Sequence, residues 1–247
     1  RRRHDGLAAD RGGCDGDGTR TQQRADWIWR NRRREWIRFH VGRIRRFMEK
    51  TVNALHAAGK RMIMNSAWTK DPFEAIYRYG VDYRAMADLG IDAFVVEAAA
   101  GASELDGYER IMGRRPLHSF MAALLMLHGY APRTRLIYLN GIKDATEGWS
   151  VLRHAPPTLE AEIHFLGNLH GYDDRGQLQR CVAGPMACTA DGIHAEEWNR
   201  LREWWETSAG FQPRRLLGAT LVWSDQAFAR QLDDYIETRR WTVHRAP

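Results

Sequence analysis

RMIMNSAWTKDPFEAIYRYGVDYRAMADLGIDAFVVE, residues Arg61–Glu97, is the stretch that decides the fold. Two short apolar runs flank a helical segment; the first ends in Asn65, and the second, Ile91–Val96, ends in Glu97. Short apolar runs are typical of buried strands, and the segment between them is long enough to bring the second strand parallel to the first. The stretch therefore predicts one β-α-β unit with a carboxylate where a buried strand ends.

The same alternation continues on both sides of this unit. A long amphipathic helix, Glu35–Gly59, precedes it, and further strands and helices follow it. The later strands are expected at Leu136–Leu139, Leu178–Ala183 and Leu216–Trp223, and the later helices at Ser119–Leu127, Thr158–Leu169, Ala195–Thr207 and Phe228–Thr238. Five β-α units in succession predict a parallel sheet with helices outside it.

We expect the fold class to be α/β, of the (β/α)8 TIM-barrel type. About five units are visible and a barrel has eight, so residues 34–247 would form a partial barrel that lacks its first strand and its last two units. A doubly wound open sheet is the second choice. No predicted strand is followed by a glycine-rich phosphate loop, which argues against a nucleotide-binding protein.

The first segment of the chain differs from the rest in charge. Residues 1–46 hold 14 Arg against 6 Asp and Glu, whereas the remainder holds 23 Lys and Arg against 25 Asp and Glu. Residues 1–33 lack an apolar period, which predicts a disordered or non-native basic leader; the alternative is an arm that binds nucleic-acid phosphates. Because Arg outnumbers Lys 33 to 4, a skew typical of GC-rich coding DNA, the arginines argue little for a nucleic-acid partner.

Composition and motifs argue against several other classes of protein. The most apolar stretch, around Phe120–Leu127, is shorter than a membrane span, and no secretory signal is visible at the start, so we expect no membrane partner and leave the compartment open. The cysteines Cys14, Cys181 and Cys188 are odd in number and lack metal-ligand spacing, which predicts buried thiols. No HExxH or HxxEH pattern occurs, so we expect neither a metal nor another cofactor.

Polar residues follow several predicted strands, where a barrel collects its catalytic groups. These residues are Asn65, Glu97, Asn140 and Asp225. Because glycosidic bonds are usually hydrolysed by two carboxylates, Glu97 is the candidate proton donor or nucleophile and Asp225 its candidate partner. The alternatives are a salt bridge from Glu97 to a loop arginine and a helix N-cap at Asp225. Asn65 and Asn140 would bind substrate hydroxyls or cap local turns.

Two tryptophans and two further acids lie in the loops beside these strand ends. Trp68 and Trp149 are the candidate platforms for stacking on sugar rings, because their positions lack the helical spacing of core tryptophans. Asp144 and Glu147 are substitutes for Asp225 as the second carboxylate. Together these residue types favour carbohydrate as the substrate.

A basic motif, RRPLHSF, lies in the loop before the helix at Ser119. Arg114 and Arg115 could bind a carboxylate through two parallel hydrogen bonds, and His118 could share acid/base work near neutral pH. These residues would suit an acidic sugar such as a sialic or uronic acid. The alternative is that they pack at the start of the helix.

The stretch GKRMIMNSAWTKDPFEAIYRYGVDYRAMADLGIDAFVVE resembles the strand-helix-strand core of TIM-barrel glycoside hydrolases, and LVWSDQAF near the end of the chain is compatible with that likeness. The resemblance covers about Trp36–Thr238 and extends to the barrel-type sialidases known from environmental DNA. It implies a glycosidase that acts on carbohydrate. The alternatives are a non-catalytic carbohydrate-binding barrel and a nucleic-acid binder. An incomplete barrel leaves strand edges unpaired, which favours a homo-oligomer.

Overall fold

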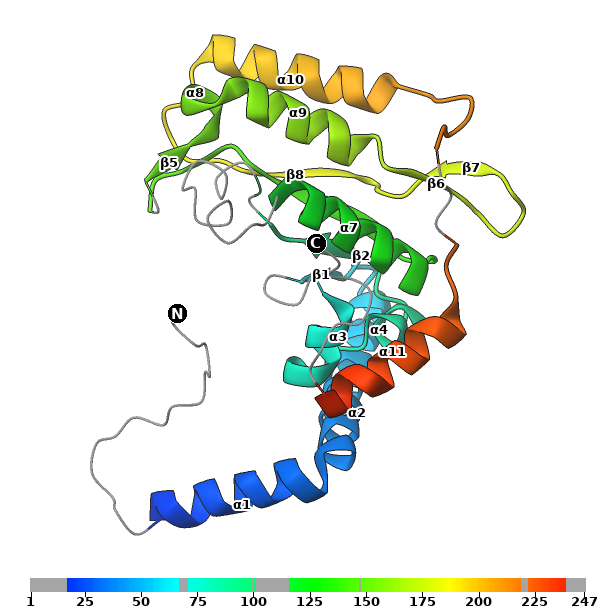
Figure 1. Cartoon of the computed structure of the whole chain (residues 1–247). Coiled ribbons are helices and arrows are strands. Elements are labelled where there is room, and N and C mark those ends of the chain that lie inside the picture. Colours follow the sequence, from blue (N-terminus) through cyan, green and yellow to red (C-terminus); the bar gives the residue numbers. More distant parts are fainter. Residues whose placement is uncertain are drawn as a thin grey trace.

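A four-stranded parallel sheet forms the centre of the protein (Figure 1). The computed structural model describes residues 17–66, 71–98, 100, 116–146, 148–218 and 222–238. The strands of the sheet are β1 (Ile63–Asn65), β2 (Ala93–Val96), β3 (Arg135–Gly141) and β8 (Gly184–Cys188). They lie side by side in the order β1-β2-β3-β8, and every neighbouring pair is parallel. The prediction of an α/β fold with a parallel sheet is therefore confirmed.

Helices connect these strands and form one layer against one face of the sheet. The chain enters β1 from α2 (Arg33–Ala57) and connects the following strands through α3 (Pro72–Glu74), η2 (Ala75–Tyr79), α4 (Tyr83–Asp88), α7 (Pro116–Tyr130), α8 (Val151–His154) and α9 (Pro156–Gly167). Neighbouring members of the layer, α2, α4, α7 and α9, contact one another in that order. The layer follows the strand order, as expected when successive β-α-β crossovers share one hand.

The main core lies between this helix layer and the sheet. Strand period 2 points Phe94 and Val96 of β2 and Leu136 and Tyr138 of β3 to the helix side, and all four are buried in one cluster with side chains of α7. Tyr83 of α4 meets Phe94 edge to face, with ring centroids 5.0 Å apart. Burial of several large apolar side chains against a single sheet face supplies the main driving force for this arrangement.

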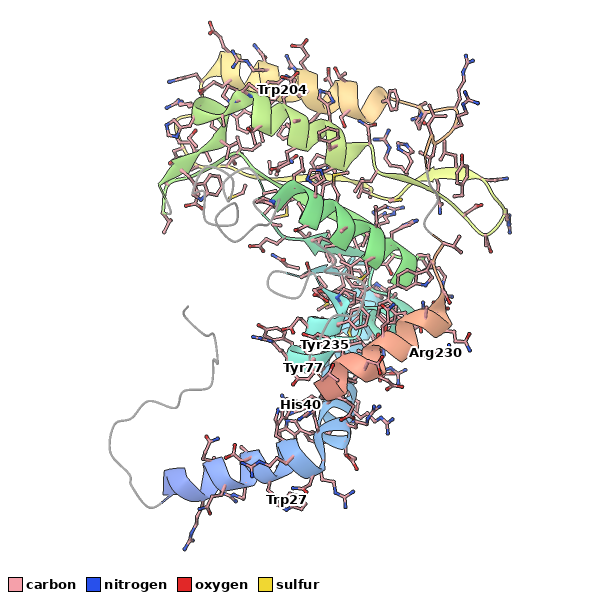
Figure 2. All side chains as sticks on the ribbon, in the orientation of Figure 1. Trp27, His40, Tyr77, Trp204, Arg230 and Tyr235 are labelled. Carbon is pink, nitrogen blue, oxygen red and sulfur yellow. The ribbon has the colours of Figure 1, made fainter. Side chains whose placement is uncertain are left out.

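Further elements extend the structure at both ends of the sheet. They are α1 (Asp17–Asn31), the antiparallel pair β4 (Lys143–Asp144) and β5 (Trp149–Ser150), the antiparallel pair β6 (His170–Tyr172) and β7 (Leu178–Arg180), α10 (Ala195–Gly210) and α11 (Asp225–Thr238). Helix α10 packs on α9 around Trp204, and α11 packs beside η2, where Tyr77 and Tyr235 meet with ring centroids 5.5 Å apart (Figure 2). The described residues thus form nine α-helices around the sheet.

Two of the expected strands differ from those observed. The fourth was expected at Leu178–Ala183, but β7 pairs with β6, and β8 at Gly184–Cys188 joins the parallel sheet. Pro185 is tolerated there because β8 is an edge strand, where one side of the backbone needs no partner. The fifth was expected at Leu216–Trp223; its described residues, 216–218 and 222–223, are not strand, and 219–221 lie outside the described part.

The first segment also contains structure that its composition did not indicate. Helix α1 spans Asp17–Asn31 within the predicted leader 1–33, and residues 1–16 lie outside the described part. Arg33 donates hydrogen bonds to the carbonyls of Ile236 and Glu237, and Arg34 pairs with Asp233 at 2.6 Å. The start of α2 is therefore attached to the end of α11.

A glycine sets how closely the β1–β2 connection approaches α2. Gly80 ends η2 with φ +67°, and a Cβ built on it would lie 2.8 Å from the carbonyl carbon of His40 in α2. That contact is with backbone, so it cannot be relieved by a side-chain rotation. Gly59, which follows α2, has the same φ but nothing within 4 Å of an added Cβ.

We expect Gly80→Ala to destabilise the fold more than Gly59→Ala. Both variants force alanine into the left-handed region, which costs about 1–2 kcal/mol, but only Gly80→Ala also overpacks the contact with His40, adding about 1–3 kcal/mol. Urea unfolding of the two variants measures the difference. Equal losses would contradict the close contact between the β1–β2 connection and α2.

A second link joins α8 to the start of α10. Arg153 of α8 binds both carboxylate oxygens of Glu197, with N–O distances of 2.8 and 3.1 Å, and the backbone N–H of His194 donates to Glu197 at 2.7 Å. The hydrogen bond from Arg153, and then that from His194, lowers the pKa of Glu197 from 4.5 to about 2. The ionised carboxylate is therefore favoured in the folded state.

This pKa shift predicts an acid-sensitive contribution to stability. A carboxyl group with a depressed folded-state pKa stabilises the fold above its unfolded-state pKa, and the contribution disappears as the pH falls from about 4.5 to about 2. Glu197→Gln should therefore lower the urea midpoint near neutral pH and have a shrinking effect on acidification. A pH-independent difference between the two proteins would contradict the assignment.

Candidate functional site at the strand ends

Asn65 and Glu97 come together where β1 and β2 end. Asn65 pairs in register with Val95, and Glu97 lies two residues beyond Val95, so both side chains project from the same face of the sheet. Asn65 Nδ2 donates a 2.7 Å hydrogen bond to Glu97 Oε2. The backbone N–H of Glu97 donates to the Oγ of Ser66, a buried side chain, at 3.4 Å. The carboxylate is thus held from both its side chain and its backbone.

This pair has the form of an oriented acid/base group. Glu97 is half-buried. Within the described part of the chain, Asn65 donates to one of the two carboxylate oxygens of Glu97, Oε2. An amide donor fixes the plane of a carboxylate without neutralising its charge, because the amide carries no net charge. The second oxygen can then accept or deliver a proton, or attack an electrophilic carbon.

The second predicted strand-end amide, Asn140, lies on the other face of the sheet. It follows Ile137, the register partner of Val95, by three residues, so its side chain projects toward the helix layer. There Nδ2 donates to Glu162 Oε1 of α9 at 2.9 Å, and Oδ1 accepts from Trp205 Nε1 of α10 at 3.1 Å. Asn140 is fully buried and joins the sheet to two helices.

Asp225 lies near the end of the sheet where the strands begin, whereas Glu97 lies at the end where they terminate. It begins α11 and accepts hydrogen bonds from Arg84 at 2.5 Å and from the indole of Trp223 at 2.7 Å. Arg84 also donates to the carbonyl of Tyr130, the last residue of α7, from which the chain goes on to the start of β3. Hydrogen bonding to Arg84, then to Trp223, lowers the pKa of Asp225.

The expectation that Asp225 shares a rim with Glu97 is therefore wrong. It rested on a strand ending at Trp223, but residues 222–224 are not strand and lie beside the C-terminal end of α7. Parallel strands place their carboxyl ends together, so a residue near the start of β3 is a strand length away from the end of β2. The ion pair with Arg84 agrees with a structural role at the start of α11.

The remaining predicted residues are distributed as follows. His118 is exposed in the first turn of α7, which begins on the side where β2 ends because α7 returns to the start of β3. Trp149 is buried in the cluster between β5, α9 and α10, so its ring packs on protein. Trp68, Arg114 and Arg115 lie outside the described residues, and their roles stay predictions.

A second carboxylate lies at the same end of the sheet as Glu97. Asp144 is the last residue of β4, three residues after the end of β3, and its Oδ2 is 4.0 Å from the Sγ of Cys188 at the end of β8. Cys188 pairs with Gly141, four residues beyond Ile137, so it lies on the same face as Glu97. The structure thus favours Asp144 over Asp225 as a carboxylate at the strand ends.

Sequence reasoning missed three residues that position these groups: Ser66, Glu162 and Trp205. Glu162 could have been found, because it stands three residues after Leu159 and four before Leu166, which both face the core of α9. A glutamate in that register must be buried and needs a polar partner. Ser66 gave no signal beyond its position next to Asn65.

Other classes of site find little support in the described part of the chain. Its His, Cys, Asp and Glu side chains form no group of three that could hold a metal ion. None of its helices is long and apolar enough to cross a membrane. Comparisons of the chain with protein-family models, with curated proteins and with solved structures find no match.

The buried network around Asn140 predicts a graded loss of stability. Asn140→Leu removes a hydrogen-bond donor to the buried Glu162 side chain and an acceptor for Trp205, which should cost about 2–3 kcal/mol. Trp205→Phe removes one hydrogen bond but keeps an aromatic ring, and should cost about 1 kcal/mol. Urea unfolding measures both values. Similar losses in the two variants would show that Asn140 contributes packing alone.

Proposed function

We propose that this chain is a glycoside hydrolase of the (β/α) barrel type that acts on carbohydrate through Glu97. The observation that carries the proposal is the 2.7 Å hydrogen bond from Asn65 to Glu97 at the ends of two adjacent parallel strands. Active sites of barrel enzymes form at this end of the strands. Glu97 is the group that transfers the proton or attacks the sugar, and Asn65 orients it.

The arrangement of the sheet supports a barrel over a doubly wound sheet. The four described strands follow one another in chain order, and the helices between them cover one face. A doubly wound sheet reverses its strand order and carries helices on both faces. A barrel keeps the chain order and places every helix outside. The chain order of the four described strands and the helices on one face support the proposal of a barrel.

Asp144 is the second carboxylate in this proposal. It lies beside the end of β8, whereas Glu97 follows β2, and β3 lies between these two strands. Retaining glycosidases need carboxyl groups about 5 Å apart, and inverting enzymes about 6.5–9.5 Å. The separation of the two carboxyl groups when substrate is bound therefore decides between retention and inversion; in inversion one acid protonates the leaving oxygen and the other activates water.

The test is hydrolysis of a panel of aryl glycosides that includes sialic and uronic acids. We expect Glu97→Gln to lower kcat by about 10²–10⁴-fold, since general acid–base groups contribute that much. Asp144→Asn should lower kcat by a factor in the same range. Asp225→Asn is the matched control: it should lower stability and leave kcat nearly unchanged.

Three results would contradict the proposal. The first is absence of turnover on every glycoside of the panel. The second is turnover undiminished by Glu97→Gln. The third is a sugar that binds by calorimetry without being hydrolysed, which would identify a carbohydrate-binding barrel instead. Proton NMR of the first-formed anomer separately decides between inversion and retention.

A further inference from the structure

Helix α2 has two faces of different composition. One face packs on the core of the protein and is formed by Ile37, Val41, Ile44, Met48 and Val52. Nearly opposite to it, side chains that are three or four residues apart form a second row along the helix. We call this row the outer stripe; its members are Trp36, Phe39, Arg43, Arg46, Phe47 and Lys50, and all six are exposed. The core therefore does not account for the residue types of the outer stripe.

The rings of the outer stripe lie open to solvent. Phe47 is 63% exposed, Phe39 is 53% exposed and Trp36 is 40% exposed. The planes of Trp36 and Phe39 are inclined by only 25°, with ring centroids 5.8 Å apart, so a flat group stacked on one ring would lie nearly parallel to the other. An apolar hollow between α1 and α2 borders the same two rings, and Ile28 of α1 also lines it. This part of the outer stripe suits planar aromatic ligand groups.

The cations of the outer stripe lack acidic partners. Helix α2 holds six Arg and one Lys against two Glu. One of these glutamates, Glu35, already pairs with Arg32 at 3.0 Å. In the described part of the chain, Arg43, Arg46 and Lys50 form no ion pair with a carboxylate. A row of exposed cations without internal anions favours a negatively charged partner.

We propose that the outer stripe binds a single strand of nucleic acid, with phosphates on Arg43, Arg46 and Lys50 and bases stacked on the exposed rings. Proteins that bind single strands combine a positively charged surface along the backbone with aromatic side chains on which successive bases stack. The bases of a duplex are already stacked on one another, so the rings favour the single strand. The abundance of arginine in the sequence argues little for this ligand; the argument comes from the alternation of cations with exposed rings on one face.

The same alternation argues against a lipid surface and against a second copy of the chain. A helix that lies on an anionic membrane places its rings on one face and its cations on another. In the outer stripe, Arg43 lies one turn from Phe39 and one turn from Phe47, on the same face. A second copy would bring two rows of like charge together, which costs free energy. A polyanion with planar groups along it matches both features of the outer stripe.

The experiment is a titration of a fluorescein-labelled oligothymidylate with the full chain, followed by fluorescence anisotropy at several salt concentrations. Arg43→Gln and Phe47→Ala remove one cation and one ring of the outer stripe. Arg45→Gln is the matched control for charge, because Arg45 is exposed and, two residues after Arg43, lies on another side of the helix. Phe165→Ala is the matched control for the ring, because Phe165 is 53% exposed on α9. Circular dichroism confirms that each variant is folded.

We expect the affinity to fall as the salt concentration rises. Arg43→Gln should reduce the slope of log K against log salt by about 0.7, the value for one phosphate contact on a single strand. Phe47→Ala should weaken binding by about 5–150-fold, the range for one base stacked on an aromatic side chain. Arg45→Gln and Phe165→Ala should bind nearly as tightly as the unmodified chain, and a duplex of the same length should bind more weakly than the single strand.

Four results would overturn the proposal. They are absence of binding at low salt, equal losses from Arg43→Gln and Arg45→Gln, undiminished binding by Phe47→Ala, and a duplex that binds as tightly as the single strand. Sedimentation with phosphatidylserine vesicles tests the rival ligand. Vesicle binding that Arg43→Gln and Phe47→Ala abolish, in a chain that does not bind the oligonucleotide, would assign the outer stripe to a membrane surface. None of these measurements requires glycoside hydrolysis, so the result is independent of the role of Glu97.

Discussion

The structure depends on the burial of one face of the parallel sheet under a single layer of helices. Phe94, Val96, Leu136 and Tyr138 project to that side and are nearly inaccessible to solvent. The strand period then dictates that their alternating neighbours project to the other side, where Asn65 and Glu97 lie. The same strand register therefore determines both which side chains pack under the helices and on which face of the sheet the candidate site lies.

Much of this architecture could be predicted from the stretch Arg61–Glu97. Its two apolar runs form adjacent parallel strands, and the residues that end them, Asn65 and Glu97, are hydrogen-bonded. The prediction succeeded there because short apolar runs bounded by turn residues lie on either side of a clear helical segment. The polar residue after each apolar run then lies at a strand end simply because it is the next residue of the chain.

The same reasoning failed where local pattern does not decide between competing partners. Leu178–Arg180 has a strand pattern, but it pairs in a hairpin, and the sheet is continued by the Gly-Pro segment of β8. Asp225 was assigned to the rim because an apolar run precedes it, although tertiary contacts with Arg84 and Trp223 hold it elsewhere. Asn140 was correctly predicted to lie at the end of a strand. The sheet face toward which its side chain projects could not be predicted, because it depends on the register in which β3 pairs with β2.

The attachment of α11 to the first β-α-β unit has a consequence for synthesis of the chain. Asp225 lies 141 residues after Arg84, and Phe228 stacks on Tyr130 with ring centroids 4.2 Å apart. At about 5–20 residues per second, the ribosome needs roughly 7–28 s to pass from Arg84 to Asp225. Until α11 is made, Phe73 and, once it has been synthesised, Tyr130 lack the aromatic partner Phe228 that α11 provides. The aromatic surface that α11 covers in the folded chain is therefore exposed until the last part of the described chain is synthesised.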